Sequence, residues 1–178
     1  MRPRFSSSVI GALLAAAMAP GAGSAQYRLP TIVSSAQADS LHDAAAALVE
    51  AGRWRDAARL HRRSAALRSP EDGRGYECLK EAAALAYYTR DRSAAREDMA
   101  RAAEHALARG ELRAAALAYL DGAWIAQEQR NRREVWELGH RAEMLAASPV
   151  LSASDRAVIL RRIDRVPEAM RLVMRTEP

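Results

Sequence analysis

The sequence predicts an all-α fold, a right-handed stack of antiparallel helix pairs of the α-solenoid type. A short turn followed by an alanine-led amphipathic run occurs three times, at 52–57, 90–95 and 130–135. Proline falls only between the periodic segments beyond residue 39, where no alternating strand pattern occurs. Repeated units of this kind stack on their neighbours to bury a continuous core. We therefore expect about three helix pairs followed by a C-terminal capping helix.

The N-terminus predicts export. Residues 1–25 combine a basic start with an apolar run at 9–18, which is too short to span a bilayer that needs roughly 20 residues. Small residues at the end of this segment predict cleavage between Ala25 and Gln26. An ordinary amphipathic helix is the alternative, but the apolar run has no polar face. The sequence thus predicts a signal peptide and a periplasmic or secreted mature protein.

Helix signals divide the remainder of the chain. We expect a flexible leader at 26–38, a helical repeat domain at 39–165, and a short terminal helix with a tail at 166–178. The helices of the domain are expected at 40–51, 54–68, 75–89, 92–108, 111–128, 131–147 and 153–165. Their inner stripes are mostly alanine with occasional larger residues, such as Ala83, Ala102, Ala123, Ala142 and Leu160. Short links between such helices favour antiparallel neighbours.

Polar residues mark where several helices begin. Ser69 followed by Pro70 predicts the start of the third helix. Asp91 or Ser93 predicts the cap of the fourth helix. The segment from Ser152 to Asp155 resembles a capping box, with aspartate in place of glutamate, and opens the seventh helix.

These residues resemble a tetratricopeptide-repeat array, in which helix–turn–helix units of about 34 residues stack through small residues. The resemblance rests on Ala57, Ala95 and Val135 near the start of each second helix, and on the turn at 52–54. The steps between these positions are 38 and 40 residues, longer than the repeat of the family. An alternative register places the turn at 110–115 and exchanges the roles of the helices.

The resemblance implies a concave groove, because the first helix of each repeat lines such a groove in this family. The implied groove positions are His42, Val49 and Glu50, then Glu77, Lys80, Tyr87 and Tyr88, and then Leu120, Trp124, Gln127 and Glu128. Rigid aromatic side chains commonly anchor bound peptides, which singles out Tyr87, Tyr88 and Trp124. The alternative is that Tyr88 and Trp124 fill space beside small alanine neighbours.

No motif for catalysis, a cofactor or a metal stands out in the sequence. The four histidines, His42, His61, His105 and His140, are not paired one helical turn apart, and Cys78 is distant in sequence from each of them. A single cysteine forms no internal disulfide, so we expect Cys78 to be buried, with an intermolecular disulfide as the alternative. No nucleophile elbow, phosphate loop or dinucleotide motif occurs. We expect no enzymatic activity, no cofactor and no metal site.

The charge does not indicate a nucleic-acid partner. The formal net charge is +5, with 27 basic and 22 acidic residues, so the arginine-rich stretches are nearly balanced. We interpret those stretches as solvated helix faces, with contact to an acidic protein or to anionic lipid headgroups as the alternative. No second long apolar run occurs, and we expect no transmembrane segment in the mature chain.

The function expected from these features is that of an exported, non-catalytic adaptor that binds a peptide or a partner subunit in the groove. The alternative is a structural, self-associating all-helical envelope component without a peptide groove. The sequence does not identify the partner of the adaptor.

Overall fold

The computed structural model describes residues 35–176, a part of the chain that contains helices and links but no β-strand. The eight helices are α1 (Ser35–Glu50), α2 (Trp54–Ala66), α3 (Gly73–Tyr88), α4 (Arg92–Ala108), α5 (Leu112–Glu128), α6 (Arg132–Ala146), α7 (Ala153–Asp164) and α8 (Glu168–Arg175). The predicted all-α class is confirmed. The expected signal peptide at 1–25 lies outside the described residues.

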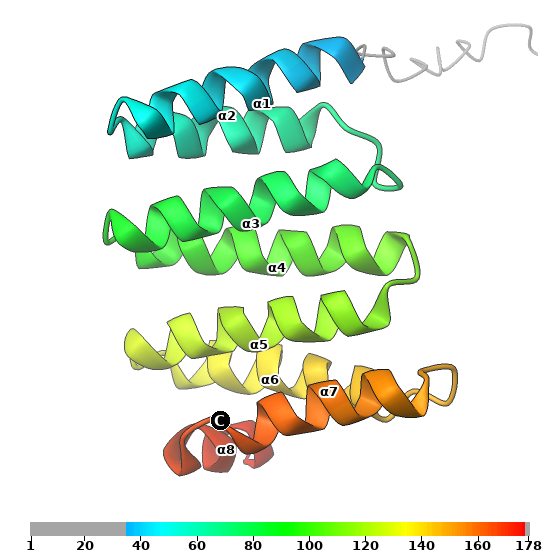
Figure 1. The fold of residues 1–178 in the computed structure, drawn as a ribbon. Coiled ribbons are helices and arrows are strands. Elements are labelled where there is room, and N and C mark those ends of the chain that lie inside the picture. The colour runs from blue at the N-terminus through cyan, green and yellow to red at the C-terminus, as the bar shows by residue number, and fades with distance from the viewer. Residues whose placement is uncertain (1–34, 177–178) are drawn as a thin grey trace, which may run out of the picture. The chain divides into compact units, whose positions relative to one another are not determined.

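The helices are arranged in two layers. Each helix from α1 to α6 packs against the next one in the chain, which confirms the predicted packing of adjacent helices. Figure 1 shows α1, α3, α5 and α7 following one another down the stack, with α2, α4 and α6 behind them. At the C-terminal end, α7 packs mainly against α5, and α8 packs against α6. The helix predicted at 153–165 and the short terminal helix predicted within 166–178 are both present and extend the layers at this end.

Four of the links share one backbone conformation. Gly52 and Gly110 have φ values of 71° and 72°, and Arg90 and Arg130 have φ values of 65° and 58°. Each of the four links is three residues long, whereas the links at 67–72 and 147–152 are longer. The same turn therefore occurs between α3 and α4, between α4 and α5, and between α5 and α6. This explains why the sequence admitted two registers for the repeat.

The core consists of small side chains where helices touch and of larger ones where space remains. Ala83, Ala102, Ala123 and Ala142 are all buried, as their stripe positions predict. The largest fully buried side chains include Leu79, Leu120, Ile159, Met170 and Met174. Burial of apolar area stabilises a fold by roughly 25 cal/mol per Å², so each alanine contributes little and the stack depends on many such contacts.

The first helix begins five residues earlier than predicted, so the last residues of the expected leader are helical. Ala38 is fully buried, and its carbonyl accepts a hydrogen bond of 2.7 Å from the Ser64 hydroxyl on α2. Ser64 thus ties α2 to the start of α1. The two residues are 26 positions apart in sequence, so no local pattern predicts the early start of α1.

Two further predictions are wrong in detail. The cap of α3 is Asp72, whose side chain accepts from the Arg74 backbone N–H, whereas the Ser69 hydroxyl accepts from Glu71 within the preceding link. On α7, Leu160 is exposed and its neighbour Ile159 is fully buried, because this helix packs mainly against α5 and presents a different face to the core.

Two predicted caps are confirmed. The Asp91 side chain accepts from the Ala94 N–H at the start of α4. At the start of α7, the Ser152 hydroxyl accepts from the Asp155 N–H at 3.1 Å and donates to the Asp155 carboxylate at 2.8 Å. Within residues 35–176, no helix combines the length and apolar character needed to cross a membrane.

Candidate functional site

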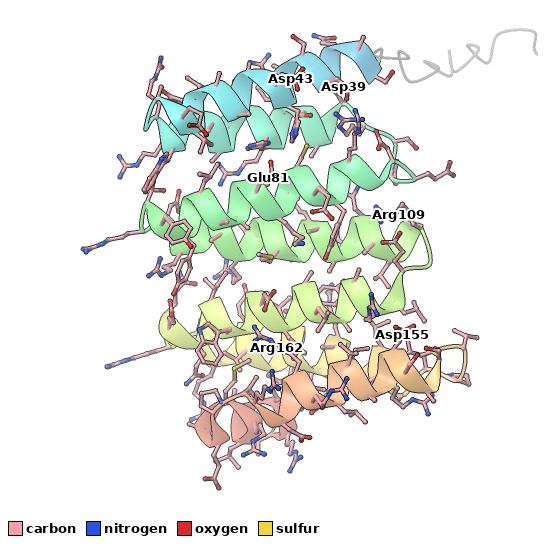
Figure 2. All side chains as sticks on the ribbon, in the orientation of Figure 1. Asp39, Asp43, Glu81, Arg109, Asp155 and Arg162 are labelled. Atoms are coloured by element: carbon pink, nitrogen blue, oxygen red, sulfur yellow. The ribbon has the colours of Figure 1, made fainter. Side chains whose placement is uncertain are left out.

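Two depressions lie next to each other along the odd-numbered helices. The first has a volume of about 320 Å³ and is lined by His42, Ala46, Val49 and Glu50 of α1, His61 of α2, and Glu81, Ala84 and Leu85 of α3. The second has a volume of about 300 Å³ and is lined by Ala83, Ala84, Tyr87 and Tyr88 of α3, Met99 of α4, Asp121, Trp124 and Ile125 of α5, and Arg162 of α7. Ala84 belongs to both linings. Figure 2 labels one residue of each depression, Glu81 and Arg162.

Aromatic side chains dominate one side of the second depression. Tyr88 is 70% exposed and Trp124 is 39% exposed, although both are large apolar groups. Trp54, at the start of α2, meets the Tyr88 ring edge-on at 6.2 Å between centroids, and Tyr87 does so at the same distance. Such edge-to-face contacts add roughly 0.5–1.5 kcal/mol to the burial of area. Three of these aromatic rings thus form a connected, partly exposed cluster.

Tyr87 is held in place from two directions. The Arg92 guanidinium lies over its ring at 3.7 Å from the centroid, and the Tyr87 hydroxyl donates to Glu128 at 2.7 Å. This hydrogen bond is the largest cause of the raised pKa of Tyr87. Arg92 also pairs with Glu128 at 3.0 Å, so the contact joins α3, α4 and α5. A fixed Tyr87 leaves its neighbour Tyr88 as the exposed ring of the cluster.

The opposite wall of the second depression carries an ion pair. Arg162 of α7 donates to Asp121 of α5 at 2.6 Å. Asp121 and Glu128 are therefore both neutralised by arginine. In the first depression, by contrast, Glu50 has no ion-pair partner among residues 35–176.

The floor of the first depression is polar. The Glu81 carboxylate lies 3.1 Å from Nε2 of His61 and 3.8 Å from Nδ1 of His42. The two imidazole rings meet edge-on at 5.2 Å between centroids. Burial, with a further contribution from His42, lowers the pKa of His61 to about 4. His61 is therefore neutral at pH 7.

Cys78 lies directly beneath this floor. Its sulfur is 3.5 Å from Nδ1 of His42 and 3.5 Å from the Ser64 hydroxyl. The predicted burial of this cysteine is confirmed, since only 1% of it is exposed. Thirty-six residues separate Cys78 from His42 in sequence, yet the fold brings them into contact. We expected no metal site because Cys78 is distant in sequence from every histidine. In the folded chain, however, Cys78 and His42 are in contact.

The remaining residues of the expected groove divide into two groups. His42, Val49 and Glu50 line the first depression, and Tyr87, Tyr88 and Trp124 line the second. Glu128 touches the second depression only through Tyr87. The residues outside both linings are Glu77, Lys80, Leu120 and Gln127.

Two of the outlying residues have clear structural roles. Leu120 is part of the buried core, so it is not accessible from the groove. Lys80 pairs with Glu77 at 3.6 Å and lies 5.0 Å from the Tyr76 ring centroid. Sequence reasoning missed Trp54, His61, Cys78 and Arg162 as neighbours of the site. Only Trp54 carried a signal, since a tryptophan directly after a turn has little core to enter.

No family model matches the chain, and no curated protein or solved structure matches it either. The geometry of the two depressions is therefore the basis for the proposed function.

Proposed function

We propose that the protein is an exported, non-catalytic adaptor that binds an extended polypeptide segment along α1, α3 and α5. In this proposal the helices form a right-handed, tetratricopeptide-like stack whose inner layer is the binding face. The observation that carries the proposal is the exposure of two aromatic side chains, Tyr88 and Trp124, that line the second of two adjoining depressions, with Trp54 packed against the Tyr88 ring. Exposed, rigid aromatic side chains are the usual anchors of peptide interfaces.

An extended ligand suits the shape of the site. The two depressions follow each other along three successive helices and share Ala84, so one continuous segment can occupy both. Alanine at positions 83 and 84 leaves room between α3 and its neighbours, because a small side chain does not fill the space between helices. A tyrosine or tryptophan at the rim provides contact area at a low cost in side-chain entropy.

The charges suggest which segment fits. Asp121 and Glu128 are already paired with arginines, whereas Glu50 is free of ion pairs within the described residues. Within residues 35–176, the ion-pair contacts of Glu81 are with His42 and His61. We therefore propose a ligand with an apolar or aromatic side chain for the second depression and a basic side chain, some residues away, for the first.

The position of Cys78 supports a binding role over a catalytic one. The only thiol of the chain lies under His42 with 1% of its surface exposed, out of reach of a bound substrate. The rim of the second depression carries no titratable pair that is free of a structural contact, since Tyr87 and Asp121 each bind arginine.

Export remains part of the proposal. The basic start and the apolar run at 9–18 favour a cleaved signal peptide and a periplasmic or secreted location. N-terminal sequencing of the protein recovered from periplasm or medium tests this directly. The proposal predicts Gln26 as the first residue, and an intact Met1 would contradict it.

The binding proposal is tested by selecting ligands from a random peptide display library on the purified protein. Recovered peptides should share an apolar anchor, and fluorescence anisotropy should show that Tyr88→Ala combined with Trp124→Ala weakens binding at least about 10-fold. Met144→Ala is the matched control, because Met144 is 60% exposed on α6 but lines neither depression. Peptides that bind the double variant as tightly as the wild type would overturn the proposal.

A further inference from the structure

The floor of the first depression gathers four side chains with metal-binding atoms. His42 comes from α1, His61 from α2, and Cys78 and Glu81 from α3, where they lie one helical turn apart. One ligand atom from each of His42, His61 and Cys78 lies within 4.8 Å of the other two. These are the only residues in the described part of the chain that cluster in this way.

The distances match a small tetrahedral site. With metal–nitrogen distances of about 2.1 Å and metal–sulfur distances of about 2.3 Å, neighbouring ligand atoms of zinc lie roughly 3.4–3.8 Å apart. Here the Cys78 sulfur is 3.5 Å from Nδ1 of His42, and Glu81 is 3.8 Å from that nitrogen and 3.1 Å from Nε2 of His61. Glu81 contacts both histidines but lies outside the group of three ligand atoms within 4.8 Å of one another, so its side chain has to rotate to reach the same ion.

One polar atom at this floor lacks a partner. Nδ1 of the buried His61 makes no hydrogen bond within residues 35–176, and buried polar atoms are nearly always satisfied. The Cys78 sulfur makes ordinary contacts of 3.5 Å with His42 and Ser64, so the missing partner is that of His61 alone. The cluster is therefore incompletely satisfied by its own members.

We propose that His42, His61 and Cys78 bind a divalent cation of the zinc class, with the Glu81 carboxylate as the fourth ligand. Imidazole and thiolate are the ligands that zinc prefers, and a carboxylate completes four-coordination. Hard cations such as magnesium and calcium require oxygen ligands, which this site supplies only once. Binding displaces the thiol proton of Cys78, since the metal ligand is the thiolate.

The ion joins three helices and adds to the polar contacts of Ser64 with Ala38 and of Arg74 with Asp39. It connects the first helix pair, α1 and α2, to α3 of the next pair, so metal binding and the docking of the first pair are coupled. The second depression and its aromatic cluster do not take part. The two proposals share the first depression, where a bound ion leaves Glu50 as the carboxylate for a basic side chain, and they are tested by separate measurements.

The test is titration of the chelator-treated, fully reduced protein with zinc, followed by competition against a chromophoric chelator. One zinc ion per chain should bind, and at a free concentration 100-fold above the Kd it should raise the Tm by roughly 5–10 °C. Cobalt in place of zinc should give a sulfur-to-cobalt charge-transfer band and the intense visible bands of a four-coordinate ion.

Variants identify the ligands. His42→Asn and Glu81→Gln change partly exposed side chains, so both proteins should fold, as circular dichroism can verify. His42→Asn and Cys78→Ser should each weaken zinc binding at least about 100-fold, since loss of an outer partner alone costs about 10–100-fold. His140→Asn is the control, because His140 stacks on Trp136 away from the cluster.

Three results would overturn the proposal. One is the absence of stoichiometric zinc binding by the folded wild-type protein. The second is zinc binding that persists unchanged in His42→Asn. The third is a cobalt spectrum of the wild-type protein that lacks the sulfur-to-cobalt charge-transfer band.

Discussion

Arg90 and Gly110 adopt the same left-handed backbone conformation at equivalent positions of two successive turns. Their φ values are 65° and 72°. In each turn the next residue donates its N–H to the carbonyl five residues back, from Asp91 to Ala86 and from Glu111 to Ala106, both at 2.9 Å. This is the Schellman arrangement, which closes a helix with a residue at positive φ. An arginine therefore occupies a position that favours glycine.

This equivalence predicts the effect of exchanging the two residue types. Glycine reaches positive φ without the steric cost that a Cβ imposes. We expect Arg90→Gly and Arg130→Gly each to raise the free energy of unfolding by about 0.5–1 kcal/mol, and Gly110→Ala to lower it by about 1 kcal/mol. Urea denaturation followed by circular dichroism measures these changes. A Gly110→Ala protein as stable as the wild type would show that the turn is not constrained.

Gly139 of α6 lies against Met174 of α8 so closely that a side chain has no room. A Cβ at Gly139 would lie 2.9 Å from Cε of Met174, and Met174 is itself 1% exposed. We expect Gly139→Ala to displace α8 and lower the free energy of unfolding by about 1–3 kcal/mol. Thermal melting, with proteolysis at the C-terminus as a probe of α8, measures the effect.

A double variant checks the cause of this loss. Met174→Ala alone should cost about 2–4 kcal/mol because it opens a cavity. Combined with Gly139→Ala, the loss should be smaller than the sum of the two single losses, because the added methyl then occupies vacated space. Strict additivity would mean that the two residues do not constrain each other.

Arg68 links the start of α1 to the start of α3 from a buried position. Its side chain is 2% exposed and donates to Asp39 at 2.6 Å and to Asp72 at 2.8 Å. Hydrogen bonds from Arg68 and Arg74 lower the pKa of Asp39. Burial raises the pKa of Asp72, but hydrogen bonds from Arg68 and from the Arg74 N–H outweigh it, so that pKa is lowered too.

The sign of these shifts sets the pH at which the link matters. A carboxylate with a lowered pKa in the folded state stabilises the fold above its unfolded pKa, and this stability is lost as the pH falls below about 4. Arg68→Ala should lower the free energy of unfolding at pH 7 by about 1–3 kcal/mol and flatten this acid-dependent loss. His61, whose pKa is lowered by burial, also makes the free energy of unfolding depend on pH. Because His61 is present in both proteins, the difference between wild type and Arg68→Ala isolates the contribution of Arg68.

The exposed Arg74 provides the control for this prediction. Its side chain is 68% exposed and contacts Asp39 at the surface. Exposed ion pairs contribute about 0–1 kcal/mol, so Arg74→Ala should have a small effect. A loss as large as that of Arg68→Ala would assign the stability to surface charge and contradict the role of the buried guanidinium.

Local signals in the sequence predicted most of the helices. Gly52 and Gly110 marked turns because glycine adopts positive φ without steric cost, and Asp91 and Ser152 marked caps through side-chain hydrogen bonds. The early start of α1 escaped prediction because Ala38 is buried by a contact with Ser64, which is remote in sequence. Leu160 was predicted to face the core, where the structure places Ile159, because the orientation of α7 depends on its packing against α5, two helices away.

The site residues likewise divide into those that the sequence predicted and those that depend on how the helices pack. The aromatic residues Tyr88 and Trp124 were identified from the groove positions that the tetratricopeptide resemblance implies, and both line the second depression. The cluster of His42, His61 and Cys78 was not found, because it forms only when α1, α2 and α3 adopt a particular packing register. Leu120 was assigned to the groove, but the close approach of α4 and α5 places it in the core.

The measurement that tests the binding face most directly is photo-crosslinking from position 88 in cells that produce the protein. A photoreactive phenylalanine analogue in place of Tyr88 preserves an aromatic ring at a 70% exposed position. We expect a discrete crosslinked adduct from position 88, formed in lower yield when Trp124→Ala is also present. We expect no adduct from the same analogue at position 144. Adducts from position 144 alone, or an adduct at position 88 that Trp124→Ala leaves unchanged, would contradict the proposed binding face.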